Sequence, residues 1–382
     1  MLLVICSKST WSPAIRREHA VAQSAAADGH EVVFVERPLD IRALRGTRSR
    51  RAWLHQLRSC PTEIRPSIRV MPQSTLIPGH RSAAAQWLDA HRLKAALGRI
   101  PAVDRAVVVA TQPWQWPAVA AAPAARRVFD VADDWRSLLP HRFDALDALC
   151  RRIAGEADSV ILASRELVPA FPGAELAVVP NGASSALTDV PVQPLPDALT
   201  MVYAGTLSER FDAQFLLEAL EHLPGWSVEL YGQCQYAGCG TAPGPELQRV
   251  LDASDVRIRW YGAVSRENLA GVLDRARVLI APHRTAHTRG QDSMKLYDYA
   301  TRDRPIVSTP GALGSPEHVA GARVREAAKP AEFARAVTEA GAEGVPVKEA
   351  RRAWVAGQSW QSRWPAWATA ALGESASEGR TR

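Results

Sequence analysis

Short apolar segments recur along the chain and alternate with stretches of helical pattern. Each segment is apolar on both faces of an extended chain, which is typical of parallel strands buried under helices. The segments lie at residues 2–6, 32–36, 106–110, 127–131, 159–163 and 176–180, and then at residues 200–205, 227–232, 256–262, 277–282 and 305–309. This alternation predicts an α/β fold with doubly wound parallel sheets.

A proline-rich stretch separates the two series of apolar segments. The first series ends in VVPNG, and residues 183–198 then carry prolines at positions 191, 194 and 196. Proline and glycine at this density are typical of a linker. We therefore predict two Rossmann-like domains, residues 1–182 and 199–345, joined by the linker 183–198.

The C-terminal region after residue 345 has a different character. Residues 346–371 carry Trp354, Trp360, Trp364 and Trp367, and the spacing of the last three suits a buried helical face. The final stretch, 372–382, is rich in small and charged residues, so we predict that it is disordered.

Length and composition agree with a two-domain globular protein. The chain has 382 residues, of which 47% are hydrophobic and 23% charged. No apolar run is long enough to span a bilayer, and the N-terminus lacks the pattern of a signal peptide. Five scattered cysteines complete no zinc-binding set, so we expect reduced thiols in a cytosolic protein.

The net charge of +6 comes from one region. Residues 42–58 hold six arginines and no acid, with Trp53, Leu54 and Leu57 between them. Such a stretch can lie on an anionic membrane, bind an acidic substrate, or be a solvated loop. We predict no nucleic-acid binding, because basic and aromatic residues do not alternate across a larger surface.

The loop after the first apolar segment excludes two classes of nucleotide-binding protein. Ser12 and Pro13 are expected at the N-cap and first position of the following helix. The loop CSKSTW before them has no glycine, and the chain has no G-x-G-x-x-G there and no G-x-x-x-x-G-K-[ST] anywhere. A dinucleotide-dependent dehydrogenase and a P-loop NTPase are therefore not predicted.

Polar residues early in the first helix suggest a catalytic group. Arg16, His19 and Gln23 share one helical face, and His19 is a candidate general base. The alternative is a solvent-exposed surface histidine.

Three aspartates end the strand at residues 127–131. Asp130, Asp133 and Asp134 lie at its carboxyl edge, where carboxylates bind hydroxyls, act as a base or hold a metal. A helix cap or turn is the alternative. We take Asp133 as a catalytic candidate and predict no metal.

Two loops in the second half offer contacts for a ligand. Gly205 ends a strand and lets a ligand approach the backbone, and Arg210 follows it and suits a phosphate. A tight turn with a surface pair between Arg210 and Asp212 or Glu209 is the alternative. Further on, the turn at 262–264 presents backbone groups, those of Val264 among them, that can read a base edge.

The segment QDSMKLYDYA, residues 291–300, carries a lysine where a helix N-terminus disfavours a cation. A helix is predicted from about 292 to 301. A diphosphate bound to the free N–H groups of Ser293 and Met294 would make Lys295 favourable. Asp298, one turn later, would bind ribose hydroxyls. The alternative is a surface ion pair between Lys295 and Asp298.

These segments together resemble the GT-B glycosyltransferases. The segments are VVPNG, YAGTLSERFD, WYGAVSRENLAGVLDRARVLIAPH, SMKLYDYATRDRPIVST and SWQSRW, in this order over nearly the whole chain. The resemblance is to the retaining, sugar-nucleotide-dependent bacterial enzymes of cell-envelope and polysaccharide biosynthesis. It implies two Rossmann-like domains facing a cleft, with the C-terminal helices 346–371 returning to the first domain.

The resemblance also implies roles for individual residues. Gly205 and Arg210 would approach the diphosphate of a UDP- or GDP-sugar, with Ser293, Met294 and Lys295 on its phosphates. Val264 would meet the base and Asp298 the ribose. A metal-independent transfer of a hexose to a glycan, lipid-linked or small-molecule acceptor in the first domain follows, with Asp133, His19, Arg210 and Lys295 as catalytic candidates. Such an enzyme would be cytoplasmic, with peripheral membrane contact through residues 42–58.

Two other functions are compatible with the same pattern. The chain departs from the family at Asp298, where glutamate is usual, and at Asp303, where glycine is usual. A nucleotide-sugar epimerase of the same shape would consume donor without an acceptor. A degenerate, non-catalytic transferase would bind nucleotide without turning it over.

Overall fold

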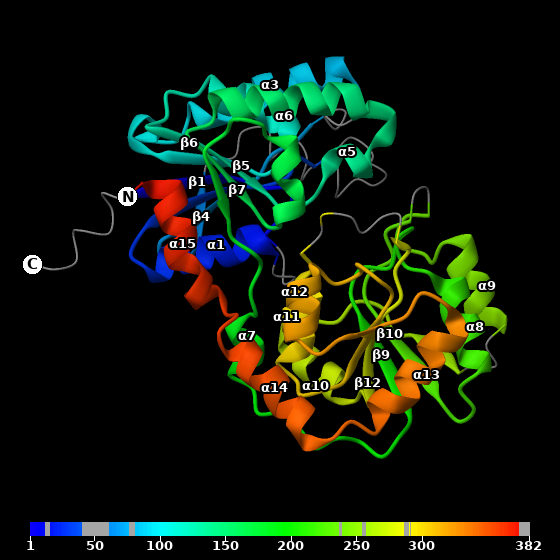
Figure 1. Cartoon of the computed structure of the whole chain (residues 1–382). Coiled ribbons are helices and arrows are strands. Elements are labelled where there is room, and N and C mark those ends of the chain that lie inside the picture. Colours follow the sequence, from blue (N-terminus) through cyan, green and yellow to red (C-terminus); the bar gives the residue numbers. More distant parts are fainter. Residues whose placement is uncertain are drawn as a thin grey trace, which may run out of the picture. The chain divides into compact units, whose positions relative to one another are not determined.

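Two compact units make up the chain, as the computed structural model shows (Figure 1). The first contains Met1–Pro180 and Arg363–Arg382, and the second contains Asn181–Ser362. The structure describes residues 1–11, 16–39, 61–75, 81–236, 239–253, 257–285, 290 and 292–373. The arginine-rich segment 42–58 and most of the C-terminal tail lie outside these ranges.

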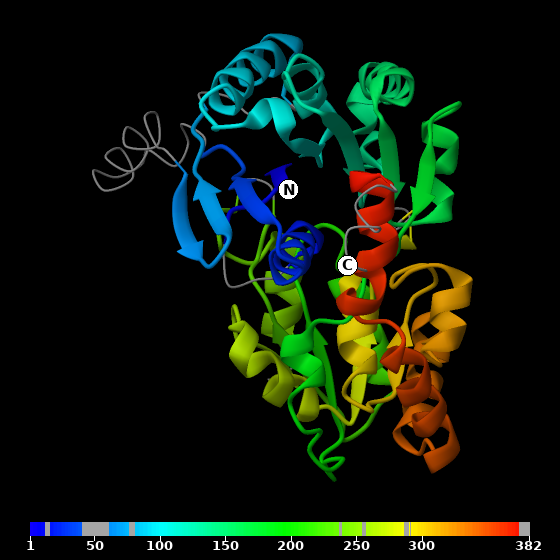
Figure 2. The same cartoon turned by 90° about the vertical axis from the view of Figure 1, so that its left-hand side faces the viewer.

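An eight-stranded sheet forms the centre of the first unit, in the order β3-β4-β2-β1-β5-β6-β7-β8. All its pairs are parallel except the edge pair β3–β4, whose place at the sheet edge can be followed in Figure 2. The strands are β1 Leu2–Cys6, β2 Glu31–Val35, β3 Thr62–Arg65, β4 Ile68–Met71, β5 Val107–Ala110, β6 Arg126–Val131, β7 Ser159–Leu162 and β8 Leu176–Val178. The six strands predicted in this half are confirmed. The pair β3–β4 was not predicted, because its sequence is charged and β3 is fully exposed.

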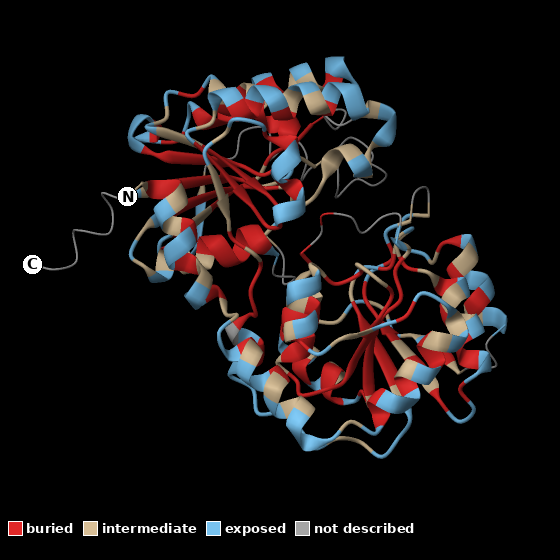
Figure 3. Cartoon of the chain, viewed as in Figure 1, coloured by how far each residue is buried: buried red, intermediate tan, exposed pale blue. Residues whose placement is uncertain are grey.

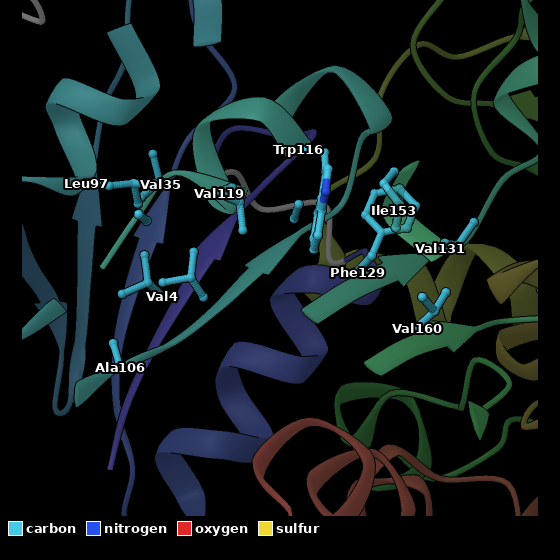
Figure 4. Close-up of a cluster of buried hydrophobic side chains, with 14 of the residues drawn as sticks. Val4, Val35, Leu97, Ala106, Trp116, Val119, Phe129, Val131, Ile153 and Val160 are labelled. Carbon is cyan, nitrogen blue, oxygen red and sulfur yellow. The ribbon is translucent and has the colours of Figure 1, made fainter. Parts of the chain in front are cut away.

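Helices cover both faces of this sheet (Figure 1). One face packs against α3 Ala83–Leu97, α4 Trp116–Ala120 and α6 Phe143–Glu156, and the other against α1 Arg17–Ala27 and α15 Trp360–Leu372. Figure 4 shows the core under α3, α4 and α6, where Trp116 lies between Val119 and Ile153. This apolar layer holds the strand ends in place.

The last helix, α15, is fastened to the first unit by its tryptophans. Trp364 donates from its indole N–H to Asp28 at 2.9 Å, and Trp367 donates to the buried Asp130 at 3.3 Å. Arg126 donates to the carbonyl of Ala371 at 3.1 Å. The chain therefore enters the first unit twice, but only from Arg363 on. The helix α14, Val345–Ala356, belongs to the second unit, so only the later part of the stretch 346–371 returns to the first.

A six-stranded, all-parallel sheet forms the second unit, in the order β11-β10-β9-β12-β13-β14. The strands are β9 Thr200–Ala204, β10 Ser227–Tyr231, β11 Ile258–Trp260, β12 Val278–Ala281, β13 Ile306–Ser308 and β14 Arg325–Glu326. Five of them are the predicted ones, and the two-residue β14 was not predicted. The doubly wound α/β fold class is confirmed.

Helices cover this sheet on both sides as well. One face carries α8 Ala213–Glu221, α9 Pro245–Ala253 and α13 Pro330–Gly341, and the other carries α7 Ser185–Thr188, α10 Arg266–Asp274, α11 Met294–Ala300 and α14 Val345–Ala356. The short α12 spans Pro316–Gly321. Figure 3 shows buried strands and helices that are buried on one side only. No described helix is long and apolar enough to cross a membrane.

The proline-rich stretch 183–198 belongs to the second unit. It contains α7, and two buried arginines, Arg302 and Arg304, hold the residues that follow. Arg302 donates to Asp274 and to the carbonyls of Leu187, Val190 and Pro191, and Arg304 donates to the carbonyls of Gln193, Pro194 and Asp274. We call this arrangement the arginine clasp. It fixes a segment whose composition suggested a free linker.

The first helix begins later than its sequence suggested. The helix α1 starts at Arg17, with Arg16 at the N-cap, whereas Ser12 was expected at that position. Ser12 and Pro13 lie outside the described residues.

Candidate functional site

A lysine side chain and a glycine backbone meet at the carboxyl end of β9. Gly205 follows this strand, and Lys295 lies in the first turn of α11. A Cβ atom at Gly205 would stand 2.0 Å from Cε of Lys295 and 2.9 Å from its Nζ. A side chain at position 205 would therefore force the lysine side chain to move. In doubly wound sheets, ligands bind at the carboxyl ends of the strands.

A tyrosine and a histidine lie buried beneath this lysine. The Tyr203 hydroxyl donates to the carbonyl of Thr206 at 2.9 Å and is 3.1 Å from Nε2 of His283. Nζ of Lys295 lies 5.5 Å from the centre of the Tyr203 ring. The ammonium group of Lys295 therefore makes a cation–π contact with the Tyr203 ring.

The imidazole of His283 is neutral. Burial holds the pKa of His283 well below its usual range, and the positive charges of Lys295 and Arg210 push it in the same direction. Both cations thus act electrostatically on one uncharged ring. This is a concentration of positive charge at the carboxyl end of the sheet.

Arg210 does not pair with Asp212, one of the two acids in the alternative to a ligand role, and its pair with Glu209 stays untested. Asp212 caps α8 by accepting the N–H of Phe215 at 3.1 Å and lies 3.6 Å from Arg284. Arg284 also contacts Glu246 at 2.5 Å. The predicted pair between Arg210 and Asp212 is therefore wrong, because Arg284 takes that acid.

The start of α11 differs from the predicted phosphate site in one respect. Ser293 is the N-cap, but its N–H donates to the carbonyl of Leu313 at 3.1 Å. The prediction that this N–H is free for phosphate is wrong. The carboxylate of the preceding Asp292 does not cap the helix, because it accepts the N–H of Asn181 at 2.5 Å and the hydroxyl of Tyr297 at 2.8 Å. Met294 and Lys295 remain as the candidate phosphate contacts.

Asp298 is buried and faces an arginine. Its Oδ2 is 3.7 Å from Nη1 of Arg266, so the ion pair of Asp298 is with Arg266 rather than with Lys295. Its Oδ1 is buried and accepts no hydrogen bond from the described residues. Burial raises the pKa of Asp298, and the positive charge of Arg266 opposes that rise. An unused acceptor oxygen therefore lies one helical turn beyond Lys295.

The turn after β11 is held against the neighbouring strand. Gly262 has a φ of 77°, and its carbonyl accepts the N–H of Gly232 at 2.7 Å. Val264 follows and packs on the apolar cluster beneath α10 and α11. The adjacent Tyr261 stacks on Tyr231 with ring centres 5.0 Å apart. The turn thus presents the backbone beyond Gly262, Val264 included, at the sheet edge.

His19 in the first unit has a structural role. Its Nδ1 accepts the N–H of Arg16 at 3.2 Å, and its Nε2 contacts the carbonyl of Thr10 at 3.0 Å. The ring is buried against Trp11 and Phe34. The alternative of a solvent-exposed histidine is wrong, because the ring is buried. The role of His19 as a general base stays a prediction, and both of its nitrogens are engaged in this structure.

The three aspartates at the end of β6 have three different environments. Asp130 is buried and accepts the Arg17 guanidinium at 2.8 Å, and burial raises its pKa. Asp134 caps α5 Trp135–Leu138 by accepting the N–H of Arg136 at 3.1 Å. Asp133 is partly exposed, as is Asp134, and it accepts Lys8 at 2.6 Å. No group of three metal-ligating side chains gathers among the described residues.

A cavity opens in the first unit at the carboxyl ends of β1, β2 and β5. It has a volume of about 460 Å³, open solvent at its mouth included. Glu36 lines it and accepts the N–H of Trp11 at 2.6 Å, and burial raises the pKa of Glu36. Arg92 also lines it and donates to the carbonyl of Ser74 at 2.8 Å. Trp114 adds an aromatic wall.

Sequence comparison identifies the second unit. Residues 198–342 match the family model described as "Glycosyl transferases group 1". Among proteins with curated descriptions, none matches the chain significantly.

Solved structures share the fold over the whole chain. The sucrose-phosphate synthase of Thermosynechococcus elongatus has a TM-score of 0.73 at 14% identity, with 99% of each chain covered. WaaG, a glycosyltransferase involved in lipopolysaccharide biosynthesis, has a TM-score of 0.67 at 14% identity, covering 98% of this chain and 100% of its own. Anabaena Alr3699/HepE in complex with UDP and glucose has a TM-score of 0.67 at 13% identity, covering 96% and 98%.

The family match and the shared fold confirm two predictions from the sequence. The fold is that of the GT-B glycosyltransferases, with two parallel-sheet units. The second unit is a group 1 glycosyltransferase domain, which confirms the glycosyltransferase class.

Proposed function

We propose that this chain, with its group 1 glycosyltransferase domain at residues 198–342, moves a hexose from a nucleotide-diphosphate donor to an acceptor hydroxyl. One observation carries the proposal. Nζ of Lys295 lies over the ring of Tyr203, whose hydroxyl is 3.1 Å from His283, and the charge of Arg210 also acts on His283, at the carboxyl ends of β9 and β12 inside the matched domain. Two cations beside an uncharged base are suited to a dianionic ligand.

The donor diphosphate would lie between these two cations. Transfer of the sugar leaves negative charge on the departing nucleoside diphosphate, and fixed cations that face this charge lower the barrier. Lys295 and Arg210 would supply that charge without a metal. UDP and glucose occur together in the structure of Anabaena HepE, which supports a UDP-sugar as one candidate donor, beside a GDP-sugar.

The nucleoside would extend from the diphosphate towards α10. The unused Oδ1 of Asp298 suits a ribose hydroxyl, since a buried acceptor gains from a hydrogen-bond donor. Met294 would contribute its backbone N–H to phosphate, and Val264 would meet the base through its backbone. Arg266 would keep the Asp298 carboxylate charged.

The acceptor would bind the first unit at the cavity beside Glu36. Aromatic, carboxylate, amide and guanidinium groups line it, which is a suitable mixture for hydroxyl groups. Asp133, at the same edge of the sheet, is the candidate acid or base. A glycan of the cell envelope or a polysaccharide, lipid-linked or not, is the proposed acceptor class. The proposed location is the cytoplasm, with peripheral contact to anionic membrane through residues 42–58.

A thermal-shift panel tests the donor site. UDP, GDP, dTDP, ADP and CMP are added to the wild type, to Lys295→Ala and to the control Lys329→Ala, whose lysine is 76% exposed. A ligand at a hundred times its Kd adds about 2.7 kcal/mol of stability. We expect one nucleoside diphosphate to raise the midpoint of the wild type and the control, but not of Lys295→Ala. No shift with any nucleotide would overturn the proposal.

Measurements of turnover distinguish a transferase from an epimerase and from a non-catalytic scaffold. Incubation of the nucleotide-sugar with and without candidate acceptors should release nucleoside diphosphate only in productive pairs or by slow hydrolysis. Conversion of donor sugar without an acceptor would indicate an epimerase. Binding without any turnover would indicate a non-catalytic scaffold.

A further inference from the structure

One ring nitrogen in the second unit is buried without a hydrogen bond. His283 is 5% exposed, and its Nδ1 has no partner among the described residues. A buried polar atom that loses its water and gains no partner costs about 1–3 kcal/mol. Such an atom next to a binding site is often completed by the ligand.

The hydrogen bonds around His283 define which nitrogen carries the proton. The Tyr203 hydroxyl uses its only hydrogen towards the carbonyl of Thr206, so its oxygen is an acceptor for His283. Nε2 of His283 therefore carries the hydrogen. In the neutral ring Nδ1 is then a bare lone pair, which only a hydrogen-bond donor can satisfy.

The backbone of His283 keeps the ring in this position. Its N–H donates to the Thr309 hydroxyl at 2.9 Å, and that hydroxyl donates to the carbonyl of His283 at 2.6 Å. These hydrogen bonds fix the main chain of His283, and the hydrogen bond to Tyr203 fixes the position of Nε2. Rotation of the ring would break the hydrogen bond to Tyr203.

The chemical groups of the proposed donor differ in whether they can donate a hydrogen bond to Nδ1 of His283. A nucleoside diphosphate has ionised phosphates at neutral pH, and these oxygens only accept. Its ribose is assigned to Asp298 and its base to the turn at Val264. The hydroxyls of the transferred sugar remain, and they lie next to the diphosphate by covalent connection.

We propose that Nδ1 of His283 accepts a hydrogen bond from a hydroxyl of the transferred sugar and positions that sugar on the diphosphate. This inference rests on the proposed function. Tyr203 acts through His283, because its hydroxyl holds the ring in the tautomer that leaves Nδ1 bare. His283 is then a specificity-determining residue for the sugar, while Lys295 and Arg210 serve the diphosphate common to all donors.

The experiment compares a nucleotide with its sugar conjugate. Isothermal titration of UDP, UDP-glucose, UDP-galactose and UDP-N-acetylglucosamine, or of the GDP series if GDP is the nucleotide found, gives the affinity added by the sugar. In His283→Phe we expect this added affinity to fall tenfold or more, with less than a twofold change for the free nucleotide. His283→Asn, which keeps an acceptor near Nδ1, should retain most of it.

A second variant tests the tautomer. Tyr203→Phe removes the acceptor of the Nε2 hydrogen, so the proton is free to move to Nδ1. We expect the same selective loss of sugar affinity, and ¹⁵N NMR of the ring should show a bare Nδ1 in the wild type and a mixed tautomer in the variant. A purely structural role would not produce this spectroscopic change.

Three outcomes are decisive. A selective loss of the sugar contribution in both variants supports the proposal. Equal losses for nucleotide and nucleotide-sugar, or no loss in either, overturn it while leaving the proposed function intact. A wild type that binds no nucleotide-sugar overturns the proposed function, and this inference with it.

Discussion

The side chain of Lys295 lies across Gly205, with Cε of the lysine 2.0 Å from the place of a Cβ atom. The contact joins α11 to the end of β9, two elements that are far apart in the sequence. It determines where the ammonium group stands. The absence of a side chain at Gly205 thus leaves room for the end of the Lys295 side chain.

We expect Gly205→Ala to displace the lysine. The added methyl would overlap with Cε, so the side chain must leave the Tyr203 ring. Nucleotide affinity should fall tenfold or more, close to the loss in Lys295→Ala, when measured by isothermal titration. The control is Gly271→Ala, because a Cβ at Gly271 meets nothing within 4 Å. Unchanged affinity in Gly205→Ala would show that the position of the lysine is unimportant.

Because of the arginine clasp, we expect substitution of Arg302 to lower the stability of the second unit strongly. Arg302→Ala leaves Asp274 without its main partner and three carbonyls without donors. The expected loss is about 3 to 5 kcal/mol in the free energy of unfolding of the second unit. Urea denaturation measures it, and hydrogen exchange should show lost protection at 187–194.

Arg335→Ala is the matched control for that substitution. Arg335 is 74% exposed and lies 4.0 Å from Glu339. Its removal should change the free energy of unfolding by less than about 0.5 kcal/mol. Similar losses in the two variants would contradict the clasp.

Trp367 should be essential for the stability of the first unit. It is fully buried and donates to Asp130, which also accepts Arg17. Trp367→Ala is expected to cost about 3 to 5 kcal/mol. The exposed Trp87, at 62% exposure, gives the control Trp87→Ala. A midpoint of denaturation that does not move in Trp367→Ala would show that α15 is dispensable for this unit.

His283 should make stability depend on pH in a defined direction. Its folded-state pKa is lowered from 6.5, so below about pH 6.5 the unfolded chain binds a proton that the folded chain excludes. The stability from the neutral ring is fully present above pH 6.5 and is lost as the pH falls. The slope for one group is about 1.4 kcal/mol per pH unit.

Substitution by an uncharged residue isolates this contribution. His283→Gln should show a shallower fall of the unfolding free energy between pH 7 and pH 5 than the wild type does. Urea denaturation across this range measures both curves. Parallel curves would mean that His283 is protonated in the folded protein.

The positions of the strands along the chain could be predicted because buried parallel strands are apolar on both faces. This signal found β1, β2 and β5 to β13, but not the charged edge strand β3 or its partner β4. The positions of Gly205 and Val264 were also within reach, since they lie shortly after strands, and Lys295 was found from its unusual charge in the first turn of a predicted helix.

Side-chain partners could not be predicted, since they depend on contacts between distant residues. His19 and Ser293 were assigned free polar atoms, which the structure pairs with Thr10 and Leu313. The sequence did not point to His283, because its unpaired nitrogen arises only from burial in the folded unit. Its burial against Tyr203, 80 residues away in the chain, is visible only in the folded unit.

The arginine clasp also has a consequence for dissecting the chain. Residues 187–194 fill the hydrogen-bonding sites of Arg302 and Arg304, although their composition suggests a dispensable tether. A separately expressed donor half that begins at residue 199 would lose these carbonyl acceptors, and only Asp274 would remain to pair with the two arginines. A fragment that begins at Asn181, where the second unit begins, would keep them satisfied.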